Sequence, residues 1–416
     1  MGKKTAEPEL TRQEVIARTL QNINTTLNAE TAKSEWKEYV VLAKDVTSPF
    51  LLRRPTGLAS LDICLGGGFP AGGSIQIGAK DGVGKNALTL QTLAMNQRIY
   101  GKESAVAWCP TEVKFDKPFA HMFGVAVPMS TEEVAQYATA REGLGYPPMS
   151  KDELKMCKRS VGTFVVIDQG STAQRLDAVA QLVQSNAFQI IVIDSVAAIL
   201  TNQRDDTPLD EFAQQSSEAF LLSEWQKKMY GAYNSGSPRD PNYTTTIMIN
   251  QVRAKRNRKG PFDRDWEIKG AHALRHAKLG DIVLSRGEIL VSTEKQKEDP
   301  EDLTARKKVK HQIGKKVRWE IAKGKAGFHE GPKGMVEYHY DTGFYIEKDL
   351  VDTAFGLGLI VQVKQGTYAL ITPDGEVVEE VRGRKGFYEK AYDIEWFDKV
   401  YKMILRKADI TCLFKL

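Results

Sequence analysis

Cysteine is scarce in this chain, and the four cysteines are too far apart for the usual cysteine sites. They stand at Cys64, Cys109, Cys157 and Cys412 of 416 residues. No two of them have the spacing of a zinc-ligand pair or of a redox pair. A disulfide scaffold is therefore excluded, and we expect free thiols in a reducing compartment.

Long apolar runs are also absent. No stretch approaches the roughly 18 apolar residues of a membrane-spanning helix, and the N-terminus is not followed by the apolar run of a signal peptide. Strong charge of one sign is lacking too, since 58 basic and 53 acidic residues leave a formal charge of +5. That mild excess permits an anionic partner without requiring one. We expect a soluble, intracellular protein.

The length suits about two or three domains, and the composition changes twice along the chain. Residues 1–47 are polar, with Ile16, Leu20 and Ile23 near helical spacing, which predicts an amphipathic helix and a tether. Residues 48–330 hold glycine clusters and short apolar runs, which predicts an α/β core. Residues 331–416 combine short strands with a helical stretch and predict a small C-terminal α/β domain.

Short apolar runs recur through the core at the separation that an intervening helix requires. They occupy residues 74–77, 104–108, 163–167, 189–193 and 244–249. Near-continuous apolar strands that alternate with helices are typical of a mostly parallel sheet covered on both faces.

Further strands are expected after these, and they could be antiparallel. They lie at residues 281–284, 289–292 and 317–322. Between them, residues 295–316 form a dense mixture of both charge signs, which favours a solvated loop or a hairpin tip.

A glycine-rich loop follows the first strand and precedes a helical stretch at 87–99. This order is typical of phosphate binding, because backbone N–H groups and a helix N-terminus converge on phosphate oxygens. The loop departs from G-x-x-x-x-G-K-[ST], since Ala79 replaces the first glycine and Asn86 the magnesium-binding hydroxyl residue. A plain glycine-rich turn is the alternative. The candidate nucleotide-binding residues are Ala79, Lys80, Asp81, Gly82, Val83, Gly84, Lys85, Asn86 and Ala87.

Polar side chains follow three of the predicted strands, at the edge where ligands of open α/β sheets bind. Asp194 is a candidate for the magnesium shell, or else a cap of the next helix. Glu112 is a candidate general base for an attacking water, or else a surface carboxylate. Gln251 is a candidate contact to a γ-phosphate, and a satisfied polar strand end explains it equally well.

These features occur in an order that resembles the bacterial and phage RecA recombinase family. The resemblance covers roughly residues 48–350 and, more weakly, the C-terminal segment. It implies a RecA-type P-loop ATPase core that uses ATP and Mg²⁺. The matching segments are Thr56-Gly57-Leu58-Ala59-Ser60-Leu61-Asp62, the phosphate loop, Glu112 with Asp116, Ile193-Asp194-Ser195-Val196-Ala197-Ala198, Ile249-Asn250-Gln251-Val252-Arg253, Gly270-Ala271-His272-Ala273-Leu274 and Lys323-Gly324-Lys325.

The resemblance implies roles around the phosphates by position. Lys85 would contact the phosphates, and Glu112 would activate water. Asp194, with Asn86, would belong to the magnesium shell. Gln251 would sense the γ-phosphate.

The resemblance also implies contacts at the two ends of the nucleotide. Asp116 and Phe119 fall where the family contacts and stacks on adenine, for which an aromatic face is apt. Lys323 and Lys325 match a lysine pair that reaches the ATP of the neighbouring subunit. From the residues alone, these two lysines would be surface lysines.

Two DNA-binding loops are implied after the strands that end near Asp194 and Gln251. The first, near residues 201–211, carries Arg204 beside several aspartates. In the second, cations can neutralise phosphates and aromatic rings can stack on unpaired bases; a solvated basic loop is the alternative. The residues of the second loop are Arg253, Lys255, Arg256, Arg258, Lys259, Phe262, Arg264, Trp266 and Lys269.

The implied function is that of an ATP-dependent DNA recombinase. It would form helical filaments on single-stranded DNA, pair them with homologous duplex DNA and catalyse strand exchange in homologous recombination or DNA repair. The N-terminal helix would pack on the next subunit, in the cytoplasm of a bacterium or a phage-infected cell. Because Asn86 is atypical, we expect slow DNA-dependent ATP hydrolysis. The alternatives are a RecA-core hexameric helicase-like motor and a hydrolysis-poor single-stranded DNA coat protein.

Overall fold

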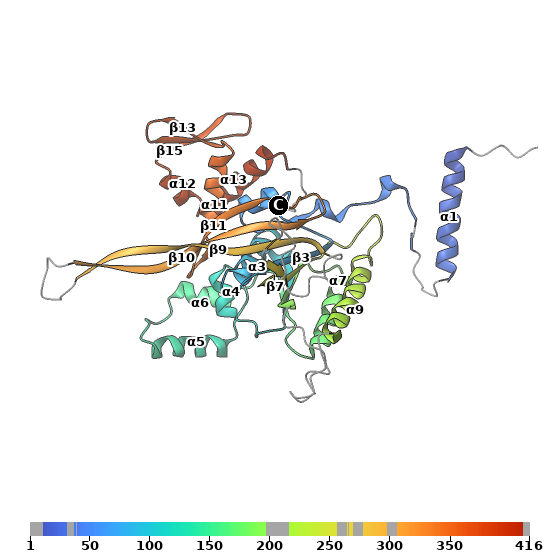
Figure 1. Cartoon of the computed structure of the whole chain (residues 1–416), viewed down its shortest axis with the longest axis horizontal. Coiled ribbons are helices and arrows are strands. Elements are labelled where there is room, and N and C mark those ends of the chain that lie inside the picture. The colour runs from blue at the N-terminus through green and yellow to red at the C-terminus, as the bar shows by residue number, and fades with distance from the viewer. Residues whose placement is uncertain are drawn as a thin grey trace, which may run out of the picture.

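The computed structural model describes residues 11–30, 37–38, 40–196, 216–255, 264, 266–268, 278–297 and 306–410. Its centre is a ten-stranded sheet of order β12-β11-β10-β9-β3-β7-β6-β4-β5, with β8 paired to β7 (Figure 1). Neighbouring strands from β9 to β5 run parallel, and those from β9 to β12 run antiparallel. The strands are β3 (Gly73–Ala79), β4 (Ala105–Pro110), β5 (Thr163–Val166), β6 (Ile190–Asp194), β7 (Thr245–Ala254), β8 (Trp266–Ile268), β9 (Lys278–Lys297), β10 (Arg306–Gly324), β11 (Lys333–His339) and β12 (Gly343–Phe344).

Helices cover both faces of the parallel half, so the predicted α/β core is confirmed. Alternate residues of β6 reach two separate hydrophobic clusters. Ile190 and Val192 pack with residues of α3, and Ile191 and Ile193 pack with residues of α7 and α9. Burial on both sides explains the uninterrupted apolar sequence of this strand. The helices of the core are α2 (Ala59–Cys64), α3 (Lys85–Tyr100), α4 (Lys117–Met122), α5 (Thr131–Gly143), α6 (Lys151–Lys158), α7 (Thr172–Gln184) and α9 (Ser216–Tyr233).

Strands β9 and β10 form a hairpin that projects far from the body of the molecule (Figure 1). The pairing runs from Gly280 opposite Gly324 to Lys297 opposite Arg306. The expected short strands at 281–284 and 289–292 are therefore one strand. Residues 306–316, expected in a loop or hairpin tip, are strand as well. A two-stranded ribbon beyond the body buries neither face fully, so its composition resembles that of a loop.

A smaller three-stranded antiparallel sheet and three helices follow the large sheet. With Ala59 of α2 and Met95 of α3 they enclose a further hydrophobic cluster, which includes Leu350, Phe387, Phe397 and Ile404. The large sheet itself continues past residue 331 through β11 and β12, and the three-part domain division stays a prediction. The elements are α11 (Ile346–Gly356), β13 (Ile360–Lys364), β14 (Thr367–Ile371), β15 (Val377–Arg382), α12 (Lys385–Lys390) and α13 (Ile394–Lys407).

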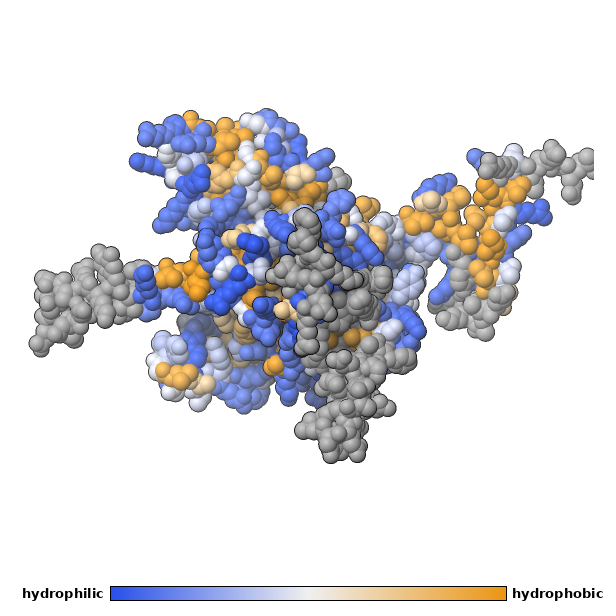
Figure 2. All heavy atoms as spheres, in the orientation of Figure 1, coloured by the Kyte–Doolittle hydropathy of each residue, from blue (hydrophilic) through white to orange (hydrophobic). Residues whose placement is uncertain are grey.

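The helix expected near the N-terminus is α1 (Arg12–Glu30). It stands apart from the rest of the chain, and Figure 2 shows apolar side chains on its surface. Val15 and Ile16 are 48% and 42% exposed. Between α1 and α2 the chain forms a 3-10 turn at Ala43–Asp45, another at Pro49–Leu51, and β1 (Arg53–Arg54), which pairs with β2 (Phe69–Pro70). Of the helices that the structure describes, none has the length and apolar character needed to cross a membrane.

Candidate functional site

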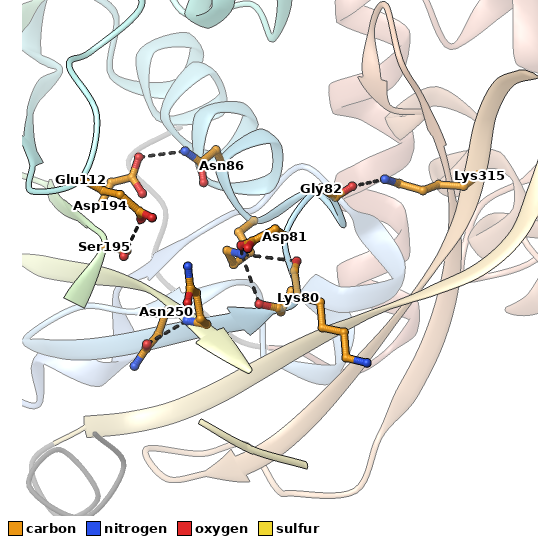
Figure 3. A network of polar contacts seen from close by, with 12 residues as sticks. Lys80, Asp81, Gly82, Asn86, Glu112, Asp194, Ser195, Asn250 and Lys315 are labelled. Carbon is orange, nitrogen blue, oxygen red and sulfur yellow. Dashed lines mark hydrogen bonds and ion pairs between the residues drawn. The ribbon is translucent and has the colours of Figure 1, made fainter. Parts of the chain in front are cut away.

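The phosphate loop connects β3 to α3 at the carboxyl edge of the parallel strands. The last residues of β4, β6 and β7 lie at the same edge, because these strands are parallel to β3 or to its neighbours. A cleft opens there, and it contains most of the candidate nucleotide residues (Figure 3). Its lining is Asp81, Gly82, Gly84, Lys85, Asn86, Ala87, Glu112, Val113, Phe119, Asp194 and Tyr338.

The backbone of the loop explains which glycines it needs. Gly84 has φ of +128°, and a Cβ on it would lie 3.1 Å from the ring of Phe344. A larger residue there would be strained and would also collide with β12. Ala79, by contrast, is a regular residue at the end of β3 and is fully buried. Alanine in place of the first consensus glycine is thus accommodated.

Lys85, the first residue of α3, turns back over the loop. Its Nζ donates to the carbonyl oxygens of Ala79 (3.1 Å) and Lys80 (3.3 Å) and lies 3.2 Å from Asp81 Oδ1. The ammonium group is therefore held inside the turn whose backbone would surround a phosphate. The phosphate contact of Lys85 stays a prediction.

Asp194 and Glu112 form a pair of acidic groups beside the loop. Asn86 Nδ2 donates to Asp194 Oδ2 over 2.8 Å, and Ser195 Oγ donates to Glu112 Oε2 over 2.8 Å. Burial, and then the charge of Glu112, raise the pKa of Asp194 to about 6, against the opposing effects of Asn86 and Lys85. Two carboxylates that disfavour each other's charge would gain from a cation between them.

The donor set suits a hard divalent cation. Carboxylate oxygens of Asp194 and the free amide oxygen of Asn86 are the kind of ligand that Mg²⁺ accepts. Asn86 is at the metal position expected from the sequence, but its amide nitrogen, not its oxygen, faces Asp194. Among the described residues, no group of three His, Cys, Asp or Glu side chains could hold a metal ion. A cation at this site would therefore need further oxygen ligands from a bound nucleotide or from water.

Gln251 is beside the start of the phosphate loop. It is in register with Ala79, because β7 and β3 are neighbouring parallel strands. Its backbone N–H donates to Asn250 Oδ1 over 2.8 Å. Gln251 is not among the residues that line the cleft. The strand continues for three more residues and leads from the edge beside the phosphate loop into the basic segment.

The two predicted adenine contacts differ in their surroundings. Phe119 lines the cleft, is 37% exposed, and packs edge-on against Phe123 with ring centroids 4.8 Å apart. Asp116 caps α4, where its Oδ1 accepts the backbone N–H of Phe119 over 3.0 Å. Phe119 is thus presented to the cleft, whereas Asp116 has a local structural task.

Lys323 and Lys325 lie away from the phosphate loop of their own chain. On β10, Lys323 is opposite Asp281, which in turn is level with Gln76 of β3. The loop follows Ala79, three residues further along β3. Neither lysine lines the cleft that contains Lys85, and their contact with the ATP of a neighbouring subunit stays a prediction.

The basic segment after Gln251 begins as a β-hairpin. Arg253 of β7 is paired with Glu267 of β8, and its side chain is exposed. Lys255 follows and is half-buried. Six predicted DNA contacts lie outside the described residues: Arg204, Arg256, Arg258, Lys259, Phe262 and Lys269.

Arg264 and Trp266 are turned onto the chain's own sheet. Arg264 Nη1 donates to the carbonyl oxygen of Ala322 over 3.0 Å, and its Nη2 lies 3.3 Å from Glu320 Oε1. Its guanidinium also stacks over Trp266, 5.1 Å from the ring centroid. Trp266 packs against a small cluster that includes Ile268. These contacts anchor the hairpin, a role that the sequence did not indicate.

Three residues of the site escaped prediction. Ser195 was noted only as part of a segment, yet its hydroxyl holds Glu112. Tyr338 of β11 lines the cleft, and Lys315 of β10 donates to the carbonyl oxygen of Gly82. No local pattern marks the last two, because they come from the antiparallel half of the sheet.

Comparison with known proteins finds RecA-type relatives. The model of the RecA N-terminal domain matches residues 159–278. The chain is 28% identical over 310 residues to protein RecA of Leptospira biflexa, a match that covers 74% of this chain and 63% of the relative. It is 25% identical to protein RecA of Solidesulfovibrio magneticus, with 86% and 82% covered. It is 31% identical over 202 residues to that of Fusobacterium nucleatum, with 48% and 42% covered.

The match to the first of these relatives thus spans less than two thirds of that protein's length. A crystal structure of the RadB recombinase is similar to this chain with a TM-score of 0.41 and 17% identity, covering 70% of this chain and 98% of that one. That likeness is too weak to support an argument. The family model and the RecA relatives together show that the chain is similar to RecA-family proteins.

Proposed function

We propose that this protein is an ATP-dependent recombinase that assembles on single-stranded DNA and exchanges strands with a homologous duplex. The observation that carries the proposal is the path of β7. Gln251 is in register with Ala79 at the phosphate loop, and the exposed Arg253 is only two residues further along the strand. One strand thus joins the sheet edge beside the phosphate loop to the basic segment.

Nucleotide binding rests on the loop and on α3. Backbone N–H groups of the loop and the N-terminus of α3 would hold the phosphates, with Lys85 as the principal cation. Phe119 offers a ring for the base. Mg²⁺, when bound, would neutralise charge on the phosphates, with Asp194 and the amide oxygen of Asn86 as the protein groups that hold it or its water shell.

Hydrolysis would depend on Glu112 as the general base. Its Oε2 is oriented by the Ser195 hydroxyl, which leaves Oε1 to accept a proton from water. Gln251 would respond to the terminal phosphate and transmit its presence along β7. Lys323 and Lys325 would act on the ATP of a neighbouring copy, which links the nucleotide to assembly.

DNA binding would use the hairpin β7–β8 and the segment that it encloses. Arg253 and Lys255, with the basic residues outside the described range, supply charge for the sugar–phosphate backbone. The apolar side chains exposed on α1 would pack on the next copy of the chain. Repetition of that contact gives a helical filament.

The experiment is strand exchange by the purified protein with ATP, with a non-hydrolysable analogue and without nucleotide. We expect exchange with ATP and none without nucleotide. Electron microscopy with single-stranded DNA should show helical filaments; closed rings would instead identify a hexameric motor. Lys85→Ala is the matched control and should abolish both strand exchange and filament formation.

A second candidate is a DNA coat protein that turns over ATP poorly. The observation that favours it is the amide of Asn86 at the metal position. Filaments that form with ATP but fail in strand exchange would support the coat protein over the recombinase.

A further inference from the structure

Lys315 of β10 is a buried cation at the back of the phosphate loop. The residue is 4% exposed, and its Nζ donates to the carbonyl oxygen of Gly82. Figure 3 shows its side chain reaching from the strand to the loop. The ammonium also lies over the ring of Tyr338 (4.9 Å) and near that of Tyr340 (5.6 Å). A strand far along the sequence thus places a positive charge against the back of the phosphate loop.

This charge has no counter-ion among the side chains that the structure describes. Among the side chains that the structure describes, no carboxylate lies within 4.0 Å of Lys315 Nζ. Its neighbours are one carbonyl oxygen, two ring faces and the like charge of Arg286. Burial and Arg286 lower the pKa of Lys315 accordingly. A buried charge is costly unless an opposite charge compensates it.

The contacts of Lys315 place its charge next to the residues that line the cleft. Two of its contacts, Gly82 and Tyr338, line the cleft beside Lys85. The backbone of Gly82 belongs to the turn that would surround the phosphates. An anion in the cleft would therefore lie on the other side of the loop from this ammonium.

We propose that Lys315 is a positioning residue for the polyphosphate of the bound nucleotide, acting in its own chain through Gly82 and through its charge. The proposal rests on the proposed nucleotide site. It assigns the β9–β10 hairpin a task at the nucleotide, beyond any contact with DNA. Lys323 near the end of β10 and Lys325 just after it do not line the cleft, and in the proposed function they would serve another chain.

The test compares three ligands that differ in phosphate number. ATP, ADP and adenosine are titrated calorimetrically into the full chain, with magnesium present. Lys315→Met removes the charge and keeps an unbranched side chain between the tyrosines. Lys315→Arg keeps the charge. Lys316→Met is the matched control, because Lys316 is the next residue, is more exposed and pairs with Glu288 at 2.7 Å.

We expect Lys315→Met to weaken ATP binding by roughly 10- to 100-fold, as for a lost charge-assisted hydrogen bond. The loss should be smaller for ADP and absent for adenosine. Lys315→Arg should recover most of the affinity, and Lys316→Met should bind all three ligands like the wild type. A purely structural role would weaken adenosine as much as ATP, would not be rescued by arginine, and would overturn the proposal.

Two further outcomes separate a failure of this proposal from a failure of the proposed function. Unchanged ATP binding in Lys315→Met also overturns the proposal, whereas a wild type that binds no nucleotide refutes the proposed function itself. If Lys315→Met does not fold, Lys315→Gln replaces it. Glutamine keeps a donor for Gly82 without the charge. Wild-type ATP affinity in Lys315→Gln would therefore show that the charge of Lys315 does not contribute to ATP binding.

Discussion

Asn86 donates its amide hydrogen to Asp194, over 2.8 Å between Nδ2 and Oδ2. A hydroxyl at position 86 would offer oxygen to a metal, whereas the amide here directs nitrogen toward the carboxylate that would hold the metal shell. Magnesium must therefore compete with an internal hydrogen bond. This relationship gives a structural reason for the slow hydrolysis that we propose.

Asn86→Thr should accelerate ATP hydrolysis. Threonine supplies the hydroxyl oxygen and releases Asp194 from the amide. We expect the DNA-stimulated kcat to rise about tenfold, equivalent to about 1.4 kcal/mol in the barrier. Steady-state phosphate release with single-stranded DNA measures it, and Asn86→Thr combined with Lys85→Ala should stay inactive. A threonine variant no faster than the wild type contradicts the explanation.

Nucleotide binding should weaken in mild acid. The pKa of Asp194 is raised to about 6 by burial and by Glu112, and a protonated carboxyl is a poor metal ligand. Magnesium-dependent ATP affinity should therefore fall as the pH drops from 7 to 5. The free energy of unfolding should depend on pH in the opposite direction. A raised pKa favours the protonated folded state, so this contribution to stability is lost as pH rises through 6. In the Asp194→Asn variant, the fall in magnesium-dependent ATP affinity between pH 7 and pH 5 should disappear.

Glu112→Gln should separate ATP binding from hydrolysis. Glutamine keeps an oxygen for the Ser195 hydroxyl but cannot take a proton from water. We expect kcat to fall about 100- to 10,000-fold, with ATP affinity and filament formation retained. Ser195→Ala should lower kcat only several-fold, since it removes the orienting bond and leaves the base. Equal losses in both variants would mean that Glu112 acts only through its contact with Ser195.

The contact between α13 and the core should depend on pH. Tyr401 OH donates to Asp62 Oδ2 over 2.8 Å, and full burial raises the pKa of Asp62 to about 7. Tyr401→Phe should cost about 1 kcal/mol in the free energy of unfolding. The cost should be larger at pH 8 than at pH 6, because the lost hydroxyl stabilises the ionised carboxylate.

Denaturant unfolding at the two pH values measures this cost. Tyr392→Phe is the matched control, since the Tyr392 hydroxyl makes a 3.3 Å contact with Tyr345 and the residue is 62% exposed. It should change stability little at either pH. A cost for Tyr401→Phe that is the same at pH 6 and pH 8 would show that Asp62 does not titrate in this range.

Much of the parallel half of the sheet could be predicted from local sequence. The uninterrupted apolar residues of β6 indicate burial on both faces, and the glycines before Lys85 indicate a phosphate-binding loop. Such features depend on neighbours within a few residues, so the sequence displays them directly. The long hairpin was harder to predict, because its exposed charged strands resemble a loop in composition.

The sequence by itself determined the order of strand, glycine turn and helix, and with it the positions of Lys85, Asp194 and Glu112 at one edge. Only the tertiary structure decided that Lys315 stands behind Gly82 and that Arg264 is bound to Glu320. Both contacts join segments separated by more than fifty residues. Strand register and sheet order decide such pairings, and these depend on how the whole sheet assembles and not on any local pattern.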